Sequence, residues 1–239
     1  MPPTRIEVTQ ATMADPTPLS APLVFEFSGR TARNRFLKAA ISERLATWDH
    51  EHLKNRGIPT KGLIDVYRRW GQGGFGIILT SNIMIEYDQL EAVGNLIIPR
   101  GTPPTGRRFE AFKGLAHEAK KEGSLIISQL SHPGRQVEST IKKQPISASD
   151  IQLKGPVIGK TFEKPRPMER SDFDAIIDGF AHAAEYCYKA GFDGVQLHAA
   201  HGYLLAQFLA PSTNHRADEY GGSLTNRARL TLDIAEAIR

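Results

Sequence analysis

The sequence predicts an α/β fold built on a parallel sheet. Short apolar runs, of the kind that parallel sheets bury on both faces, alternate four times with segments of helical spacing. This alternation of strand and helix is the pattern of consecutive βαβ units, and four units are half the number in an eight-unit barrel. Polar and aromatic residues follow the last apolar run, where such folds bind ligands.

Length and composition favour one domain. The chain has 239 residues, of which 40% are hydrophobic, and this is enough for one sizeable core. Its formal net charge of +4 comes from 30 Lys and Arg against 26 Asp and Glu. These charges are spread along the chain without a basic block, so the composition does not indicate nucleic-acid binding.

Cysteine usage and hydropathy indicate a cytoplasmic protein. Cys187, the single cysteine, lies in an amphipathic helical pattern, so we expect neither an internal disulfide nor a cysteine cluster for a metal. The N-terminus lacks the basic and then apolar order of a signal peptide. No apolar run reaches the roughly 18 residues of a membrane span, so we expect no membrane partner.

The beginning of the chain differs from the rest. Residues 1–30 are interpreted as an irregular N-terminal segment, in which Leu23–Phe27 is compatible with a short strand or hairpin arm. The first strand of the sheet is expected over Arg35–Ile41, with Ser42 at its carboxyl end.

The remaining units follow in order. Continuous apolar runs predict three further strands, over Phe75–Thr80, Ser124–Leu130 and Asp193–Leu197. Helical spacing predicts four helices, over Lys61–Trp70, Arg107–Glu122, Ser171–Lys189 with Ser171 as N-cap, and Asn226–Ile238. A local charge network is expected to stabilise the loop and the last helix, and its members are Asp218, Glu219, Arg227 and Arg229.

The most informative stretch follows the last predicted strand. It contains His-x-x-His-Gly-Tyr over 198–203, then Gln207-Phe208-Leu209, Pro211, Asn214, Arg216, Asp218-Glu219-Tyr220-Gly221-Gly222-Ser223 and Asn226-Arg227. This long combination resembles the signature of the Old Yellow Enzyme family, the flavin-dependent ene-reductases related to NADH:flavin oxidoreductases. Weaker similarity extends back to Asn34.

The resemblance implies a TIM (β/α)8 barrel that holds flavin mononucleotide (FMN) at the carboxyl ends of its strands. Residues 31–239 would form the N-terminal half of that barrel, with roughly the first four βα units, so the chain resembles a C-terminally truncated member. The family binds NAD(P)H as a transient reductant over the flavin. No G-x-G-x-x-G motif or P-loop occurs, so a separate nicotinamide-binding domain is not supported.

His198 and His201 lie three residues apart at a strand end. Two imidazole donors can hold and polarise a carbonyl or nitro oxygen, and the resemblance assigns both histidines to catalysis and substrate binding, with His198 also at the flavin. A zinc pair and strand-end histidines bonded to backbone remain alternatives. Zinc requires three or four ligands and the HExxH spacing is absent, so we expect no metal.

Tyr203 follows the second histidine and can reach the same pocket from the start of the loop. A phenol can donate a proton to a developing carbanion. The resemblance therefore implies that Tyr203 is the catalytic proton donor and a substrate-binding residue. The alternative is an aromatic wall residue.

The remaining candidates are expected to contact the flavin. Gln129 ends the third strand, and its carboxamide can pair with a donor and an acceptor on the pyrimidine edge of the ring. Without the resemblance, a capped strand end would be the simpler interpretation. Ser42 stands where relatives carry Thr or Cys against a flavin carbonyl, and Asn82 replaces a small Ala or Gly. Ala40 and Ile41 complete the ring-facing set.

The activity implied by the resemblance is FMN-dependent reduction of the activated C=C bond of α,β-unsaturated carbonyl compounds by NAD(P)H. The alternative is an inactive truncated half-barrel that lacks flavin or only associates with other chains, including copies of itself, through the open barrel edge. A phosphate-handling TIM-barrel isomerase or aldolase ranks below both, because no suitable strand-end Lys or carboxylate set is visible.

Overall fold

A computed structural model describes residues 15–157 and 159–239. The centre of the fold is a parallel sheet, as predicted, with the strand order β3–β4–β6–β9. The bounds of these strands are Leu37–Lys38 for β3, Ile77–Met84 for β4, Leu125–Ser131 for β6 and Gly194–Leu197 for β9. The short β5, Leu96–Ile97, pairs in parallel with the carboxyl end of β4.

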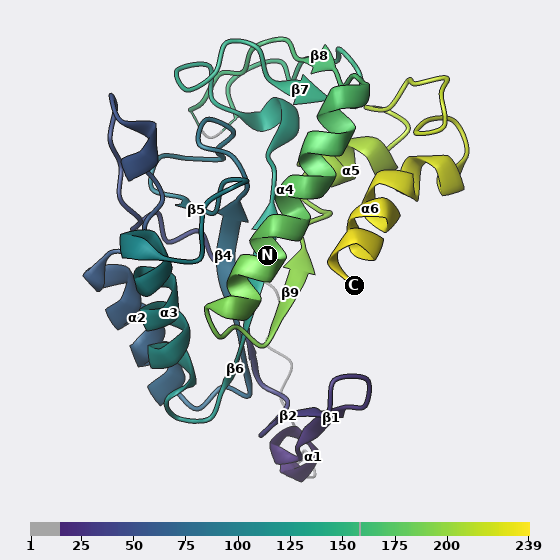
Figure 1. Ribbon diagram of the computed structural model, residues 1–239. Coiled ribbons are helices and arrows are strands. Elements are labelled where there is room, and N and C mark those ends of the chain that lie inside the picture. The colour runs from purple at the N-terminus through teal and green to yellow at the C-terminus, as the bar shows by residue number, and fades with distance from the viewer. Residues whose placement is uncertain (1–14, 158) are drawn as a thin grey trace, which may run out of the picture.

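Helices connect the strands and cover the sheet. They are α2 (Lys61–Gln72), α3 (Gly106–Lys120), α4 (Arg170–Lys189) and α6 (Leu224–Ile238). In Figure 1, α2 and α3 lie side by side, while α4 crosses in front of the sheet with α6 beside it. Gly71 permits the close approach of α2 to α3, because a Cβ there would lie 2.6 Å from the carbonyl oxygen of Ala119.

The apolar faces of these helices pack on the sheet in one main core. Its members come from α2, α3, β6, α4, α5 and α6, and they include Leu63, Phe112, Ile126, Phe180, Phe208 and Leu230, each at most 1% exposed. Burial of side chains of this size stabilises a fold by about 1.5–3 kcal/mol each before the entropy cost of ordering them. The core therefore holds the strand ends in fixed positions.

The start of α4 differs from the prediction. The helix begins at Arg170 with Glu169 as N-cap, so the assignment of Ser171 as N-cap was wrong. The Glu169 N–H donates to the carboxylate of Asp172 at 2.7 Å, and Arg166 holds the same carboxylate at 2.6 Å. This carboxylate in the first turn satisfies a free backbone donor, which gives the helix its earlier start.

The first predicted strand is also shorter than expected. Only Leu37–Lys38 of the range Arg35–Ile41 pairs with β4. The Asn34 side chain accepts the Phe36 N–H at 3.0 Å, which withdraws that donor from the ladder.

The N-terminal segment is partly regular. Residues 1–14 of the predicted irregular segment lie outside the described residues, but Thr17–Ser20 forms α1, so the prediction was wrong there. The predicted hairpin arm is confirmed: β1 (Leu23–Phe25) pairs antiparallel with β2 (Arg30–Ala32). The buried carboxylate of Asp193 anchors this hairpin, because it lies 2.6 Å from Arg30 and 2.7 Å from Lys120. The hairpin lies near the amino ends of the strands (Figure 1).

Long loops and short elements gather at the carboxyl ends of the strands. They comprise the 3-10 turns Leu53–Asn55 and Gly134–Gln136, the parallel pair β7 (Ile146–Ser147) and β8 (Arg166–Pro167), and α5 (Leu204–Leu209). None of these short elements was predicted from the sequence. Within the part of the chain that the structure describes, no helix is both long and apolar enough to cross a bilayer.

The predicted charge network before α6 is present in another form. Asp218 pairs with Arg216 at 2.5 Å and Glu219 with Arg170 at 3.4 Å. Arg229 and Arg227 instead donate to backbone carbonyls, those of Glu219 at 2.7 Å and of Leu209 at 2.8 Å. The loop is thus tied to α6 by arginine-to-backbone bonds, and its carboxylates pair with other arginines.

Candidate active site

One small cleft, of about 70 Å³, brings together all the site residues predicted from the sequence. Its lining residues are Ala40, Ile41, Ser42, Asn82, Gln129, His198, His201 and Tyr203. They come from the segment after β3, from β4, from β6 and from the turn after β9. Because parallel strands end at the same edge of a sheet, residues far apart in sequence meet there.

A bulge in β4 sets the position of Asn82. The pairing of β4 with β6 shifts between Leu79 and Asn82, and the Thr80 hydroxyl there accepts the Gln129 N–H at 3.0 Å. Bulges commonly redirect a side chain next to a functional site. Asn82 is only 4% exposed, and its carbonyl oxygen Oδ1 lies 3.5 Å from the Ser42 hydroxyl.

A buried network below the cleft links the segment after β3 to β4. The Tyr67 hydroxyl donates to Glu43 at 2.7 Å and accepts the Ser81 N–H at 2.9 Å. Lys38 lies 3.8 Å from Glu43, and burial lowers the pKa of Lys38 to about 8. Glu43 and Ser81 directly adjoin Ser42 and Asn82, so the network fixes the backbone of both cleft segments. The sequence reasoning missed it, because its members are distant in the chain.

Gln129 has a partner that the sequence reasoning also missed. Its Nε2 donates to Oε1 of Gln196 at 2.8 Å, and the two residues are paired in the β6–β9 ladder. The period-2 alternation of side chains along a strand would have placed Gln196 on the same face as Gln129. Together the two amides form a polar floor between β6 and β9.

His198 is a neutral donor in the cleft. It is 6% exposed, and burial, assisted by the neighbouring His201, lowers its pKa to about 4. Its Nδ1 accepts the Ala200 N–H at 3.3 Å, so the single proton of the neutral ring resides on Nε2. The ring can therefore donate one hydrogen bond to a ligand oxygen.

His201 occupies an unusual backbone conformation. Its φ is +55°, in the left-handed region that few non-glycine residues adopt, and Gly202 follows at +70°. Gln136 holds this turn, because its Nε2 donates to the carbonyl oxygens of His201 at 2.8 Å and of Gly202 at 2.7 Å. Strain that the surroundings maintain in this way is characteristic of ligand-binding turns.

Tyr203 completes a group of three rings. The His198 and Tyr203 ring centres are 4.9 Å apart, and those of His201 and Tyr203 are 6.1 Å apart. Burial, with a smaller contribution from Glu91, raises the pKa of Tyr203 well above its usual value. The phenol therefore keeps its proton at neutral pH.

Gln207 supports the turn from below. It is fully buried, and its Nε2 donates to the carbonyl oxygens of Gly202 at 2.6 Å and of Pro133 at 3.0 Å. Its Oε1 accepts from the Ser147 hydroxyl at 2.8 Å. The sequence motif contained Gln207, but its role depends on tertiary contacts that spacing does not reveal.

No metal site is formed by the described residues. In the ranges 15–157 and 159–239, no group of three or more His, Cys, Asp or Glu side chains is arranged to hold a metal ion. The two cleft histidines face each other and Tyr203 instead.

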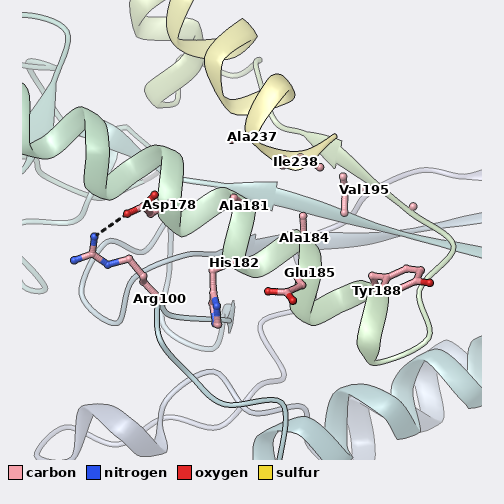
Figure 2. Close-up of a pocket in the computed structure, with 11 residues that line it drawn as sticks. Arg100, Asp178, Ala181, His182, Ala184, Glu185, Tyr188, Val195, Ala237 and Ile238 are labelled. Atoms are coloured by element: carbon pink, nitrogen blue, oxygen red, sulfur yellow. Dashed lines mark ion pairs between the residues drawn. The ribbon is translucent and has the colours of Figure 1, made fainter.

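A larger groove lies away from these residues. It measures about 690 Å³ and lies beside β9, between α4 and the end of α6 (Figure 2). Its lining is mixed: Val195, Ala181 and Ile238 are apolar, and Arg100 lies 3.7 Å from Asp178 at one end. It lies along the free edge of β9, which pairs only with β6 in the described sheet.

Comparison with known proteins identifies the family. Residues 20–239 match the NADH:flavin oxidoreductase / NADH oxidase family. The chain belongs to this family. A family relative, the NADH-dependent flavin oxidoreductase nadA of Aspergillus parasiticus, is 53% identical over 224 residues, which are 94% of this chain and 50% of the relative. The 12-oxophytodienoate reductase 1 of Oryza sativa subsp. japonica is 34% identical over 69% of this chain and 48% of its own length.

Solved structures of the family show the same fold. The Old Yellow Enzyme homologue from Zymomonas mobilis superposes with a TM-score of 0.78 at 32% identity, over 92% of this chain and 59% of that chain. Morphinone reductase superposes with a TM-score of 0.77 at 26% identity, over 92% of this chain and 58% of that chain. The resemblance to Old Yellow Enzymes is thus confirmed, as is the TIM-barrel class. The chain spans about half the length of the curated relatives it matches.

Proposed function

We propose that this chain provides the catalytic face of an FMN-dependent oxidoreductase that uses NAD(P)H to reduce the activated C=C bond of α,β-unsaturated carbonyl compounds. The observation that carries the proposal is the convergence of His198, His201 and Tyr203 with the strand-end amides in one cleft. Family relatives support it, since one is named an NADH-dependent flavin oxidoreductase and another a 12-oxophytodienoate reductase.

The donor set of the cleft fits a flavin ring. Ser42, Asn82 and Gln129 present a hydroxyl and two carboxamides, which match the alternating donors and acceptors of the pyrimidine edge. Ala40 and Ile41 add apolar surface beside them, and Ile41 is 56% exposed, as a ring-contacting side chain would be before a ligand covers it. When bound, FMN would supply hydride-transfer chemistry that side chains lack.

The chain's own residues would orient the substrate and supply a proton. His198 donates through Nε2, and His201 approaches from the strained turn, so the two rings would hold and polarise the carbonyl oxygen. Tyr203 retains its proton at neutral pH and would transfer it to the α carbon of the substrate. Buried Gln207 and the Gln136 bonds maintain the turn that presents these groups.

Anaerobic mixing tests this function. The flavin-loaded protein is first bleached with NADH or NADPH, and an enone such as 2-cyclohexenone is then added. We expect the enone to restore the flavin absorbance with formation of the saturated ketone. A reduced flavin that stays bleached in the presence of the enone would contradict the proposal, whereas the failure of one nicotinamide would only identify the preferred reductant.

We also propose that the described strands correspond to the first four βα units of the barrel, that residues 1–30 precede this half-barrel, and that the protein is cytoplasmic.

The free edge of β9 and the groove beside it favour a second candidate function. In this alternative, the chain alone binds no flavin and associates through this edge with other chains, including copies of itself. Analytical ultracentrifugation distinguishes the two, because a flavin-free chain that self-associates would support the second candidate.

A further inference from the structure

A buried polar chain runs from the protein surface to Asn82. Arg44 donates to Oε1 of Glu91 at 2.7 Å, and Oε2 of Glu91 accepts from Nδ2 of Asn95 at 3.3 Å. The same Nδ2 lies 3.3 Å from Oδ1 of Asn82, to which the Ser42 hydroxyl also points at 3.5 Å. Glu91 and Asn95 line no part of the cleft, and no role was expected for them.

The orientation of the Asn95 carboxamide follows from its two other partners. Its Oδ1 accepts the backbone N–H of Ala92 at 2.7 Å, which only an oxygen can do. Its Nδ2 faces the carboxylate of Glu91, which offers acceptors only. Both ends of the amide are thus fixed, and Asn95 is 2% exposed, so solvent provides no alternative partner.

This orientation determines how Asn82 lies. Because Asn95 presents an N–H to Asn82, the atom that receives it must be the carbonyl oxygen Oδ1. The Asn82 Nδ2 then points away from Asn95, and within residues 15–157 and 159–239 it makes no hydrogen bond and is not fully enclosed. Asn82 lines the cleft, so Nδ2 is a free donor there.

The backbone holds the turn that carries Glu91 and Asn95. Gly94 has φ +85°, and its Cα packs so closely on Arg44 that an added Cβ would lie 2.5 Å from the Arg44 carbonyl oxygen. The Ala46 N–H also donates to the carbonyl oxygen of Gly94 at 3.1 Å. The turn is therefore pressed against the segment that follows Ser42.

We propose that Glu91 and Asn95 are positioning residues of the flavin site, which turn the Asn82 carboxamide so that its Nδ2 donates a hydrogen bond to a ring carbonyl of bound FMN. The inference rests on the proposed function, since it concerns the same cleft. It assigns a directional role to Asn82 that a small residue at this position cannot supply. A donor at a ring carbonyl strengthens flavin binding and favours the reduced, more electron-rich ring.

A double variant that preserves the net charge reverses the direction of the hydrogen bonds between positions 91, 95 and 82. In E91Q/N95D, Oε1 of the new glutamine still accepts from Arg44, and its Nε2 donates to the new aspartate. The aspartate has no donor for Asn82 and can only accept a hydrogen bond from it. Asn82 must then turn its Nδ2 toward position 95 and present Oδ1 to the cleft. Neither the net charge nor the number of heavy atoms changes, and Asn82→Ala provides the matched control without a donor.

The test is FMN affinity, measured by quenching of flavin fluorescence, together with the flavin midpoint potential. We expect Asn82→Ala to weaken binding about threefold and E91Q/N95D about tenfold, because an acceptor facing a ring carbonyl is worse than no group at all. Both variants should lower the midpoint potential. Adding Asn82→Ala to E91Q/N95D should return the affinity to that of Asn82→Ala alone, because the effect passes through this side chain.

Unchanged FMN affinity in E91Q/N95D would overturn the proposal, as would a loss that persists in the triple variant. Hydrogen exchange of the side-chain amides, followed by NMR without flavin, tests the orientation separately. The Asn82 amide should exchange faster than that of Asn95 in the natural chain and become protected in E91Q/N95D, and equal rates would overturn the orientation. A natural chain that takes up no FMN while showing this exchange pattern would contradict the flavin-binding function and leave only the orientation standing.

Discussion

The centres of the imidazole rings of His198 and His201 lie 5.0 Å apart, and the rings meet nearly edge to face, at an interplanar angle of 74°. Two donors at this spacing can converge on one ligand oxygen, with His198 neutral and protonated on Nε2. We expect His201→Ala to weaken binding of a carbonyl ligand about tenfold. Titration of the ligand against the flavin absorbance measures this, and equal affinity in the variant would remove His201 from the site.

Tyr203 is predicted to act in turnover more than in binding. Tyr203→Phe keeps the ring that packs 4.9 Å from His198 but removes the proton, so enone reduction should slow by about 10²–10⁴-fold while ligand affinity changes little. Single-turnover reoxidation of the reduced flavin by an enone gives the rate. If the variant turns over normally, Tyr203 is a wall residue and the proton comes from elsewhere.

The depressed pKa of His198 predicts a loss of stability in mild acid. The unfolded chain protonates this side chain near pH 6.5, whereas the folded protein does so only near its pKa of about 4. The stability present above pH 6.5 should therefore fall as the pH approaches 4, by up to about 1.4 kcal/mol per pH unit from this residue. Urea unfolding at several pH values measures the free energy of unfolding, which should fall less steeply with decreasing pH in His198→Asn than in the natural chain. An identical slope in both proteins would argue against a buried neutral ring.

Buried His132 adds to the same trend. It is 1% exposed, and burial lowers its pKa to about 3. For this reason His198→Asn should reduce the loss of folding stability at low pH without abolishing it.

Gln207 should matter for stability out of proportion to its size. Gln207→Leu leaves the Ser147 hydroxyl and the Arg135 N–H without the acceptor Oε1. It also removes one of two donors from each of the carbonyl oxygens of Gly202 and Pro133, which keep their bonds from Gln136, and we expect a total cost of about 3 kcal/mol. Gln152→Leu is the control, because that amide donates one bond, to Phe162 at 2.7 Å, and its loss should cost about 1 kcal/mol. Chemical unfolding compares the two, and equal losses would show that Gln207 does not anchor the turn.

Alanine substitutions at Gly94 and Gly101 distinguish the cost of backbone strain from the cost of a steric clash. Both have positive φ, but an added Cβ at Gly94 meets the Arg44 carbonyl oxygen at 2.5 Å, whereas an added Cβ at Gly101 meets no atom of the described residues within 4 Å. Gly101→Ala should cost about 1 kcal/mol from the left-handed conformation alone. Gly94→Ala should cost more in the same thermal or urea unfolding experiment, and it should also weaken FMN binding. Equal costs would mean that the turn at residues 91–95 is not packed as described.

The sequence predicted the sheet and the cleft well for one physical reason. Each predicted site residue stands at or just after the carboxyl end of an apolar run, and parallel pairing brings such ends together. The start of α2 at Lys61 agrees with the prediction, and the Thr60 hydroxyl caps it by accepting the Leu63 N–H at 3.2 Å. In contrast, α6 begins at Leu224, earlier than the predicted Asn226, because Ser223 is its N-cap. The chemical roles of His198, His201 and Tyr203 came from the resemblance and stay predictions.

What could not be predicted depends on contacts between distant residues. Two such contacts are those of Glu43 with Tyr67 and of Asn95 with Asn82, which form only when the strands pair. No local sequence pattern predicts either contact. The shortened first strand has a similar origin, because the Asn34 side chain competes for a backbone donor, and propensity does not report such competition.

Flavin binding by the cleft is tested most directly by retention of FMN on the purified 239-residue chain after desalting. We expect a yellow protein whose flavin absorbance bleaches with NADH or NADPH and whose FMN affinity falls in Asn82→Ala. A folded chain that elutes colourless after incubation with excess FMN would contradict flavin binding by this chain.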